Sequence, residues 1–412
     1  CSCPVEWGGG EVFLTPRAAE EYRIRFAASE GSFYDRGQRR TSMATPNYTV
    51  EENELYCVDV SNGFTGVDHH FTPYELHISL APGEKKEIGV VCGLLSGQEA
   101  ENQGALDALS RAGEIFAAAK TRGERLLLQA KSNDALTGRL VLSADHFLVR
   151  RESTGMMTVL AGYPWFADWG RDTMIAFTGL TLATGRFAEA REVLLSFAEY
   201  VSRGMLPNVF PNHANEEPMY NTIDASLWYF YAVYKYLQYT TGLSYYKETF
   251  KDVKGKYPDG VELTEEEVFV RDSLYPVLCE IFERYRDGGA RYDIHMDEDG
   301  LVMGGGGFDH LTWMDVRVGD IVVTPRPGKA VEINAVWYNA ICCLRLLKQR
   351  FFGDGTVYKD LDELAGRVQR SFLDKFWNED KGCLYDTIDE EGRGDMDLRR
   401  NQIFAGSLPF HM

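Results

Sequence analysis

The sequence predicts a mainly α-helical protein, a toroid of paired helices preceded by an antiparallel β-sandwich-like domain. Three observations predict this fold class. Up to about residue 98, apolar and polar residues alternate in short runs, as they do in half-buried strands. From Ser132 onward, the spacing of the apolar residues changes to about 3.6, the period of an amphipathic helix. Short and long links alternate between these helices, and no strand–helix alternation occurs, which argues against a Rossmann or TIM-barrel fold.

The composition predicts a soluble, globular protein and limits its partners. The 412 residues suffice for two or three domain-sized units, and 44% hydrophobic with 25% charged residues is ordinary for a chain with a packed core. No apolar run approaches the ~18 residues of a membrane span. The net charge of −19 would repel nucleic acid and anionic membrane surfaces, whereas it suits a neutral substrate.

The eight cysteines favour a reducing, cytoplasmic location. None forms a C-x-x-C pair, and Cys279, Cys342 and Cys343 fall inside apolar helical patterns, where cysteine acts as a small buried residue. The chain begins with Cys1 rather than Met, so we expect the natural N-terminus to lie upstream, and a signal peptide there is left open.

Residues 1–98 form the predicted N-terminal β-sandwich-like domain, which we expect to be incomplete at its start. Its clearest strand is Tyr74–Leu80, where apolar and polar residues alternate cleanly before a turn at Ala81–Glu84. The other predicted strands are Glu11–Thr15, Tyr22–Phe26, Leu55–Val60 and Glu87–Cys92. Residues 99–131, rich in Ala, Glu and Leu, are predicted to be a helical linker.

Residues 132–412 form the predicted helical domain, and Ser132–Asp134 offers N-caps for its first helix. The predicted helices cover residues 132–148, 172–184, 187–202, 220–239, 265–286, 331–350, 358–377 and 400–408. Between them we expect an exposed polar insertion at 242–262, a hairpin at Tyr292–Phe308 that turns at Asp297–Gly300, and an irregular segment at Leu311–Lys329.

One irregular stretch, Gly162–Thr173, concentrates four aromatic residues, two Asp and an Arg. Pro164 and Gly170 interrupt regular structure there. A segment this aromatic should not lie in water, so we expect it to line a concavity. Its rings would pack against the apolar face of a ligand and its charged groups would bind hydroxyls, a combination that suits a sugar. The alternative is a buried loop whose Asp–Arg pair only holds two helices together.

Two carboxylates near predicted helix starts have both a structural and a functional interpretation. Asp172 is either the N-cap of a helix that begins at Thr173 or an acceptor for sugar hydroxyls. Asp224 is either the third helical residue of a variant capping box headed by Asn221 or a carboxylate that binds ligand. The interpretations are compatible, because a helix N-terminus that faces a cavity can be capped and bind a ligand.

A third carboxylate, Asp315, is the best candidate for a proton donor. It follows Trp313 in an irregular segment, where an aromatic, apolar wall favours the protonated acid. The alternative is a structural pair with Arg317 or Arg326. Glu332 begins an otherwise apolar helix, which is costly without a partner. Stabilisation by the helix N-terminus is the alternative for Glu332.

No cofactor and no metal site is predicted. Asp297, Asp299 and Gly300 resemble part of a calcium loop, but His295 and Gly306 occupy the outer positions, where carboxylates are needed. The pair His69-His70 has no third ligand nearby. The glycines at 304–307 are not followed by the Lys-Ser/Thr of a phosphate-binding loop.

Several motifs occur in a fixed order: Ala161–Phe166, Asp168–Thr173, Tyr220–Asn221 with Asp224–Ala225, Thr312–Asp315, Thr324–Arg326 with Gly328–Tyr338, and Leu398–Pro409. Together they resemble the C-terminal glucosidase region of glycogen debranching enzymes, the amylo-α-1,6-glucosidase family. The likeness runs from about Ser132 to the end of the chain. Residues 1–98 resemble, more loosely, the later part of the β domain that precedes the barrel in bacterial relatives.

This resemblance implies an (α/α)6 barrel, of which about eight of twelve helices are present here. It also implies hydrolysis of α-1,6-linked glucose at the branch points of glycogen or starch, with inversion of configuration and Asp315 as the general acid. The residues that it places around the terminal glucose are Trp165, Trp169, Arg171, Asp172, Asp224, Trp313, Lys329, Glu332 and Trp337. The implied partner is glycogen or another branched α-glucan, with no nucleic acid and no membrane.

The chain departs from the family's pattern at the general base. An inverting enzyme needs a second carboxylate that activates water, roughly 6.5–9.5 Å from the acid. In the family this base is a Glu close to the end of the barrel, so here it is expected beyond Met412 and the barrel is expected to be open. Residues 1–412 alone are therefore predicted to hydrolyse little, even if they bind glucan.

Two alternatives stay open at this point. The first is a related (α/α)6 α-glucosidase that acts on trehalose or another oligosaccharide, because nothing local to the motifs fixes the linkage. The second is a non-catalytic glucan-binding protein that keeps the pocket and lacks the base. A generic helical scaffold explains poorly why aromatic and carboxylate residues concentrate in irregular segments.

Overall fold

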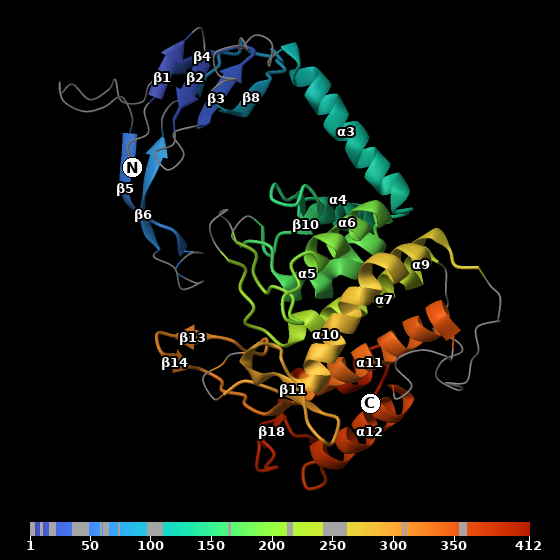
Figure 1. Cartoon of the computed structure of the whole chain (residues 1–412). Helices are drawn as coiled ribbons and strands as arrows, with labels where there is room; N and C mark the ends of the chain where they lie inside the picture. The colour runs from blue at the N-terminus through green and yellow to red at the C-terminus, as the bar shows by residue number, and fades with distance from the viewer. Residues whose placement is uncertain are drawn as a thin grey trace. The chain divides into compact units, whose positions relative to one another are not determined.

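A computed structural model (Figure 1) describes residues 5–8, 11–15, 22–34, 49–57, 60, 66–72, 75–96, 110–163, 166–211, 217–241, 262–306, 309, 311–353 and 361–412. The chain divides into two compact units, Cys1–Glu124 and Arg125–Met412. The boundary falls inside segment 99–131, the predicted helical linker.

The first unit is built from antiparallel strands. Its four-stranded sheet has the order β1–β2–β3–β8, formed by β1 (Val5–Gly8), β2 (Glu11–Leu14), β3 (Tyr22–Ala28) and β8 (Val90–Ser96). Two further ladders pair β4 (Ser32–Tyr34) with β7 (Glu75–His77) and β5 (Thr49–Leu55) with β6 (Val67–Thr72). Val12, Leu14 and Ala27 are buried.

The strand predicted at Tyr74–Leu80 covers only Glu75–His77, so this prediction is corrected. The boundaries of two further strands also differ from the prediction. The strand predicted at Leu55–Val60 instead ends at Leu55, and the strand predicted at Glu87–Cys92 instead covers Val90–Ser96. In both cases the partner sets the boundary: β5 pairs with β6 although β5 is rich in acidic residues, and β8 pairs with β3 along its whole length. Pairing between strands satisfies the hydrogen-bonding groups of the backbone whatever the side chains are. The acidic sequence of β5 therefore did not predict a strand there.

The helix α3 (Ala112–Gln129) contains the boundary between the two units. Its last residue, Gln129, donates its side-chain amide to the carbonyl of Gly185 over 2.6 Å. The start of the predicted linker, residues 99–109, lies outside the described residues.

The second unit is helical, so the mainly α-helical class predicted for it is confirmed. Its α-helices are α4 (Ala135–Asp145), α5 (Gly170–Phe177), α6 (Phe187–Ala198), α7 (Asp224–Thr240), α9 (Glu265–Phe269), α10 (Tyr275–Asp287), α11 (Val331–Phe352), α12 (Leu361–Phe376) and α13 (Phe404–Ser407). Two π-helical turns continue α5 and join α9 to α10: η2 (Thr178–Leu182) and η3 (Val270–Leu274). The 3-10 turns are η4 (Arg291–Asp293) and η6 (Arg400–Ile403).

The helices α7 and α11 form the core of the second unit. Helix α7 contacts α5, α6 and α11, and α11 also contacts α12. Both helices are buried on nearly all sides, as their apolar and aromatic sequences require. Tyr229, Phe230 and Trp337 have no accessible surface, and burying a large apolar side chain contributes roughly 1.5–3 kcal/mol.

Two predicted caps are wrong. Helix α5 begins at Gly170 after Trp169, so Asp172 lies in the first turn and is not the N-cap. Helix α7 begins at Asp224, which makes Asp224 the first helical residue and excludes Asn221 as its cap. A tertiary contact replaces the predicted capping box, because the backbone N–H just before α7 donates to the carbonyl of Leu311 at 2.9 Å.

The cap of α4 is confirmed, although the helix is shorter than predicted. The Asp134 carboxylate accepts hydrogen bonds of 2.9 Å from the backbone of Leu136 and Thr137. Helix α4 ends at Asp145, and a strand, β9 (Leu148–Arg150), begins where the helix was expected to finish. The polar insertion predicted at 242–262 lies almost wholly outside the described residues.

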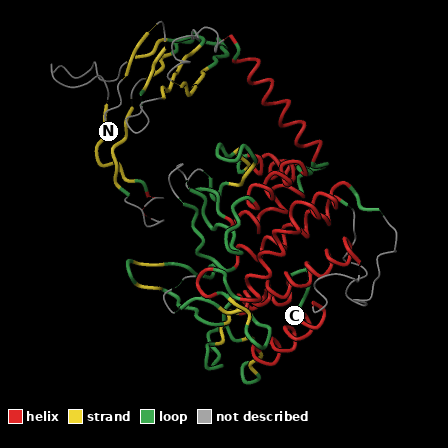
Figure 2. Tube along the Cα trace, in the orientation of Figure 1, coloured by secondary structure: helices red, strands yellow, loops and turns green. Residues whose placement is uncertain are grey.

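Short hairpins and long loops gather on one side of these helices (Figure 2). The predicted hairpin is present as β11 (His295–Met296) and β12 (Val302–Met303), and Gly300 N closes its turn onto Asp297 O at 2.9 Å. The other pairs are β9 with β10 (Met157–Val159), β15 (Lys329–Ala330) with β18 (Thr387–Ile388), and β16 (Trp377–Asn378) with β17 (Cys383–Leu384). No helix in the described ranges is long and apolar enough to cross a membrane.

A two-stranded ribbon, β13 (Arg317–Val318) and β14 (Ile321–Val322), follows directly after Asp315. Val323 N donates to Val316 O, so the pairing extends by one residue on each side. Because alternate residues of a strand share a face, one face of the ribbon carries Val316, Val318, Ile321 and Val323. These four side chains are between 53% and 68% exposed.

Candidate active site

The candidate site is centred on Arg171, in the first turn of α5. Its Nε donates to Asp224 Oδ2 at 2.7 Å, and its Nη1 donates to Asp315 Oδ2 at 3.2 Å. The guanidinium thereby joins three separate segments: the start of α5, the start of α7 and the loop that precedes β13. The sequence predicted these three residues as site residues, and the structure brings them together.

The start of α5 is held in place by its backbone. Gly170 N donates to the carbonyl of Asn208 at 2.8 Å, and the carbonyl of Pro207 lies 2.2 Å from where a Cβ at position 170 would stand. Only glycine permits this approach. Arg171 and Asp172 therefore begin the helix at a fixed position against the 207–209 segment.

The electrostatics of the cluster tie Asp172 to it. Asp172 is at the exposed edge of the site, yet desolvation of its carboxyl group raises its pKa. The charge of Arg171 opposes this rise in pKa, and the charges of Asp224 and Asp315 add to it. For Arg171, burial alone would lower the pKa, but the charges of Asp224 and Asp315 outweigh it and raise the pKa above its ordinary value. Arg171 is therefore a permanent cation among three carboxyl groups.

Two buried atoms of this cluster have no hydrogen-bond partner within the part of the chain that the structure describes. They are Nη2 of Arg171 and Oδ1 of Asp224. A buried polar atom without a partner costs about 1–3 kcal/mol, so folded proteins rarely keep such atoms without a use for them. One unpaired donor and one unpaired acceptor in the same cluster are the two kinds of group with which a sugar hydroxyl forms hydrogen bonds, since it can accept from the first and donate to the second.

The predicted tryptophans have different environments. Trp169 precedes α5, bridges by its backbone to Val209, and makes an edge contact with the ring of Phe166 at 6.4 Å between centroids. Trp313 donates its indole N–H to Asn401 Oδ1 at 3.0 Å, and both residues are half-buried or deeper. Trp165 lies outside the described residues.

The aromatic loop that precedes α5 differs from the prediction. Tyr163 and Phe166 are about half exposed, at 52% and 50%, so the loop does not shield all of its rings from water. Asp168, by contrast, has a structural role: it is buried and accepts from Arg151 at 2.7 and 2.8 Å and from Thr158 at 3.0 Å. The rings can stay exposed because the loop is held at Asp168, through its backbone bridge to Leu160 and its ion pair with Arg151, and not by the burial of every ring.

Three other predicted residues are not brought to Arg171. Trp337 has no accessible surface, stacks on Phe282 and donates to the carbonyl of Gly300 at 3.0 Å, so the prediction that it lines a sugar pocket is corrected. Trp337 is a core residue because the part of α11 around it is buried on nearly all sides.

Lys329 and Glu332 are buried in ion pairs of their own. Lys329 Nζ donates to Asp297 and Asp299 at 2.7 Å each, in the turn of the β11–β12 hairpin. This contact also explains the calcium-like spacing of the two Asp residues, because the ammonium group binds both carboxylates. Glu332, in the first turn of α11, accepts two hydrogen bonds from Arg326, so the partner that its burial requires is present.

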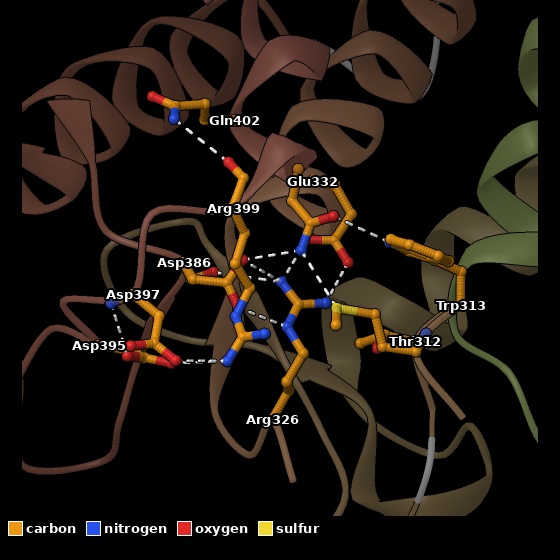
Figure 3. A network of polar contacts seen from close by, with 11 residues as sticks. Thr312, Trp313, Arg326, Glu332, Asp386, Asp395, Asp397, Arg399 and Gln402 are labelled. Atoms are coloured by element: carbon orange, nitrogen blue, oxygen red, sulfur yellow. Dashed lines mark hydrogen bonds and ion pairs between the residues drawn. The ribbon is translucent and has the colours of Figure 1, made fainter. Parts of the chain in front are cut away.

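Arg326 and Glu332 belong to a buried network that the sequence did not reveal (Figure 3). Arg326 also donates through Nε to Asp386 Oδ2 at 2.7 Å and through Nη2 to Asp386 Oδ1 at 3.0 Å. Asp386 Oδ1 further accepts from Asn401 Nδ2 at 2.7 Å. The alternative in which Asp315 pairs with Arg326 is therefore wrong, since Arg326 is committed to Glu332 and Asp386.

The Arg171 cluster suits a neutral, hydroxyl-rich ligand. A fixed cation, carboxylates and unpaired donor and acceptor atoms bind hydroxyl groups, and neighbouring Trp rings can cover an apolar face. Asp315 is the more open of the two carboxylates on Arg171, because its side chain is 25% exposed while that of Asp224 is 4% exposed. A carboxyl group that reaches solvent beside a bound ligand can transfer a proton to it.

Comparison with known proteins adds family information. A sequence model of the family described as "Amylo-alpha-1,6-glucosidase" matches residues 142–412. The chain is 27% identical to the "Glycogen debranching enzyme" of Saccharomyces cerevisiae, in an alignment that covers 51% of this chain and 16% of that enzyme. The chain thus spans only a small part of the length of this relative.

Two solved structures show a distant likeness. A GH78 rhamnosidase of Bacillus sp. GL1 matches with a TM-score of 0.39 and 14% identity over 57% of this chain and 20% of that one. A rhamnosidase from Klebsiella oxytoca with rhamnose bound matches with a TM-score of 0.38 and 15% identity over 57% of this chain and 38% of that one. Both likenesses are too distant to support a conclusion.

Proposed function

The chain belongs to the amylo-α-1,6-glucosidase family, and on that premise we propose that its second unit binds the α-1,6-linked glucose of a branched glucan such as glycogen. We further propose an (α/α)6 barrel as its complete architecture and Asp315 as the general acid of an inverting hydrolysis. The observation that carries the proposal is the bridge that Arg171 makes between Asp224 and Asp315, with unpaired buried atoms on both Arg171 and Asp224.

Recognition would fall to Arg171, Asp172 and Asp224. Asp224 anchors the guanidinium at 2.7 Å, which leaves Nη2 of Arg171 to donate to one sugar hydroxyl and Oδ1 of Asp224 to accept from it or from a neighbour. Asp172 adds a carboxyl at the exposed edge. Trp169 and Trp313 would cover the C–H face of the ring, which offers apolar area without hydrogen-bonding groups.

Proton transfer would fall to Asp315. As the bond between the anomeric carbon and the glycosidic oxygen breaks, Asp315 gives its proton to that oxygen. A second carboxylate, the general base, takes a proton from the water molecule that adds to the anomeric carbon from the opposite face. A protonated Asp315 keeps an acceptor oxygen for Arg171 while its hydroxyl donates to the substrate. Its partial exposure, which Asp224 lacks, favours it for this role.

Calorimetric titration of the chain with isomaltose, maltose and trehalose tests the recognition step. We expect isomaltose, the α-1,6-linked disaccharide, to bind most tightly, and Arg171→Met to abolish measurable binding. Arg345→Met is the matched control, because Arg345 pairs with exposed Asp362 and the substitution removes the same charge. A preference for trehalose would favour the alternative specificity, and a chain that binds none of the three sugars would refute the proposal.

A further inference from the structure

Asn401 uses its whole amide group to join Thr312–Asp315, here called the acid loop, to the buried network around Arg326 and Asp386. Its Oδ1 accepts from Trp313 Nε1 at 3.0 Å, while its Nδ2 donates to Asp386 Oδ1 at 2.7 Å and contacts Met314 Sδ at 3.5 Å. Asn401 is 1% exposed. Its orientation is therefore fixed, since a flipped amide would place a donor against the indole N–H and an acceptor against a carboxylate.

The residue before Asn401 holds the same tryptophan from another direction. The guanidinium of Arg400 lies over the Trp313 ring, 4.8 Å from its centroid. Both residues belong to η6, so one short turn near residue 400 contacts the edge of the indole through Asn401 and its face through Arg400. Trp313 is thus oriented by a segment that lies 87 or more residues away in the sequence, and the acid Asp315 is two residues further along.

The network behind Asn401 is buried and joined by hydrogen bonds. Asp386 is 2% exposed and its carboxylate also accepts from Arg326, while Val331 N donates to the Asp386 carbonyl at 3.0 Å. Arg326 continues the chain of bonds to Glu332 in the first turn of α11 (Figure 3). A buried and satisfied network of this kind fixes the groups attached to it.

From these contacts we infer that Asn401 is a positioning residue for the reaction: it orients Trp313 and Met314, and through them it sets where the Asp315 carboxyl meets the substrate. The inference rests on the proposed function, in which Asp315 is the acid. Asn401 itself offers no group to the substrate, because its amide oxygen and nitrogen already bond to Trp313 and Asp386. Its effect must therefore pass through Trp313, which makes the inference testable by coupling between the two positions.

The first test needs no sugar. The ¹⁵N-labelled chain gives an indole N–H signal for each Trp, and the signal of Trp313 is the one missing from Trp313→Phe. We expect Asn401→Ala to move that signal, because its hydrogen-bond acceptor is lost. Gln402→Ala is the matched control on the same turn, since Gln402 bonds to Leu384 and Arg399 and not to the acid loop. An unmoved Trp313 signal in Asn401→Ala overturns the inference, whatever the sugars do.

The second test is a double-mutant cycle with two ligands, neutral isomaltose and the cationic iminosugar 1-deoxynojirimycin, which pairs with a carboxylate at the cleavage point. Losing one hydrogen bond should weaken iminosugar binding about three- to tenfold in Asn401→Ala. If Asn401 acts through Trp313, Trp313→Phe and the double variant should bind equally, because the second change removes nothing more.

The outcomes separate the two proposals. Independent, multiplying losses in the cycle, or an Asn401→Ala variant within twofold of the unmodified chain, would refute the positioning role. If the unmodified chain binds neither ligand, the proposed function fails instead, while the indole signal still reports whether Asn401 holds Trp313. If both ligands weaken equally and the effects multiply, Asn401 serves only the fold, and the positioning role is again refuted.

Discussion

Two arginines of the second unit, Arg171 and Arg326, each bind two carboxylates, yet their surroundings differ. Arg326 is buried with Glu332 and Asp386, and each of its three guanidinium nitrogens donates to one of them. Arg171 binds Asp224 and Asp315, but its Nη2 has no partner among the described residues.

This difference indicates that a cluster of charged residues can be classified by the hydrogen-bond donors and acceptors that it leaves without a partner. A closed pair of bidentate contacts holds segments together and offers nothing to a ligand. An open cluster with a spare donor and a spare acceptor carries an energetic cost that a ligand can remove. On this criterion we propose the Arg326 cluster as scaffold and the Arg171 cluster as the binding site.

The largest expected effect comes from breaking the scaffold. Arg326→Met should lower the free energy of unfolding by about 3–5 kcal/mol, because Glu332 would remain buried without a cation and Asp386 would keep only its ion pair with Arg399 Nε at 3.1 Å. Urea unfolding measures it. Arg171→Met should cost less, about 1–3 kcal/mol, since Asp315 reaches solvent and only Asp224 would remain buried without a cation. Equal losses for the two variants would contradict the comparison.

The next largest effect concerns ligand affinity. Arg171→Met should weaken isomaltose binding about 10- to 100-fold, the equivalent of a hydrogen bond to a charged group. Arg345→Met should leave the affinity unchanged. Calorimetry measures both, and a site that binds sugar without Arg171 would show that the spare atoms of this cluster have no role in recognition.

A smaller effect is expected at Asp315. Asp315→Asn keeps the shape and removes the charge, so the free energy of unfolding should fall by about 1 kcal/mol, because the amide oxygen still accepts from Arg171 but the ion pair is lost. The affinity for isomaltose should change little. The cationic iminosugar should bind about tenfold more weakly, because its charge partner is lost. Should the two ligands respond alike, Asp315 would not face the cleaved bond.

The smallest effects are in the pH dependence of stability. They have opposite signs at Asp172, beside Arg171, and at Asp297, which binds Lys329. The pKa of Asp172 is raised by desolvation, so its contribution to stability is full below its unfolded value, near 3.8, and is lost as the pH rises through the folded value. The pKa of Asp297 is lowered, first by its hydrogen bond to Lys329. Its contribution is present above about 3.8 and is lost as the pH falls through the folded value.

Urea midpoints between pH 3 and pH 7 separate these contributions. Asp172→Asn should remove the loss of stability that occurs as the pH rises. Lys329→Met should remove part of the loss of stability that occurs on acidification. If Lys329→Met weakened isomaltose binding as strongly as Arg171→Met, the assignment of Lys329 to the scaffold would be wrong.

The sequence predicts the open cluster better than the closed one. Arg171, Asp224 and Asp315 lie in irregular segments or at helix starts, where charged and aromatic residues have no reason to collect unless they act on a ligand. The mainly α-helical class follows from the change of period near Ser132, because that pattern is set by each helix alone.

The scaffold could not be predicted because it depends on partners far along the chain. Glu332 and Asp386 are separated by more than fifty residues, and nothing near Asp386 signals that its carboxylate will be buried against Arg326. Trp337 was misplaced for a related reason: the sequence of α11 is compatible with a buried or a pocket-lining indole, and only the packing of Phe282 against it decides.

The ribbon that follows Asp315 has a consequence for how the protein behaves in solution. Its β13–β14 face presents Val316, Val318, Ile321 and Val323 to water, and an exposed apolar patch favours association with another apolar surface. Concentrated samples should therefore self-associate through this ribbon despite the strong negative charge. Lysine at positions 318 and 321, on the far end of the ribbon from the acid, should restore a monodisperse sample while sugar binding is kept.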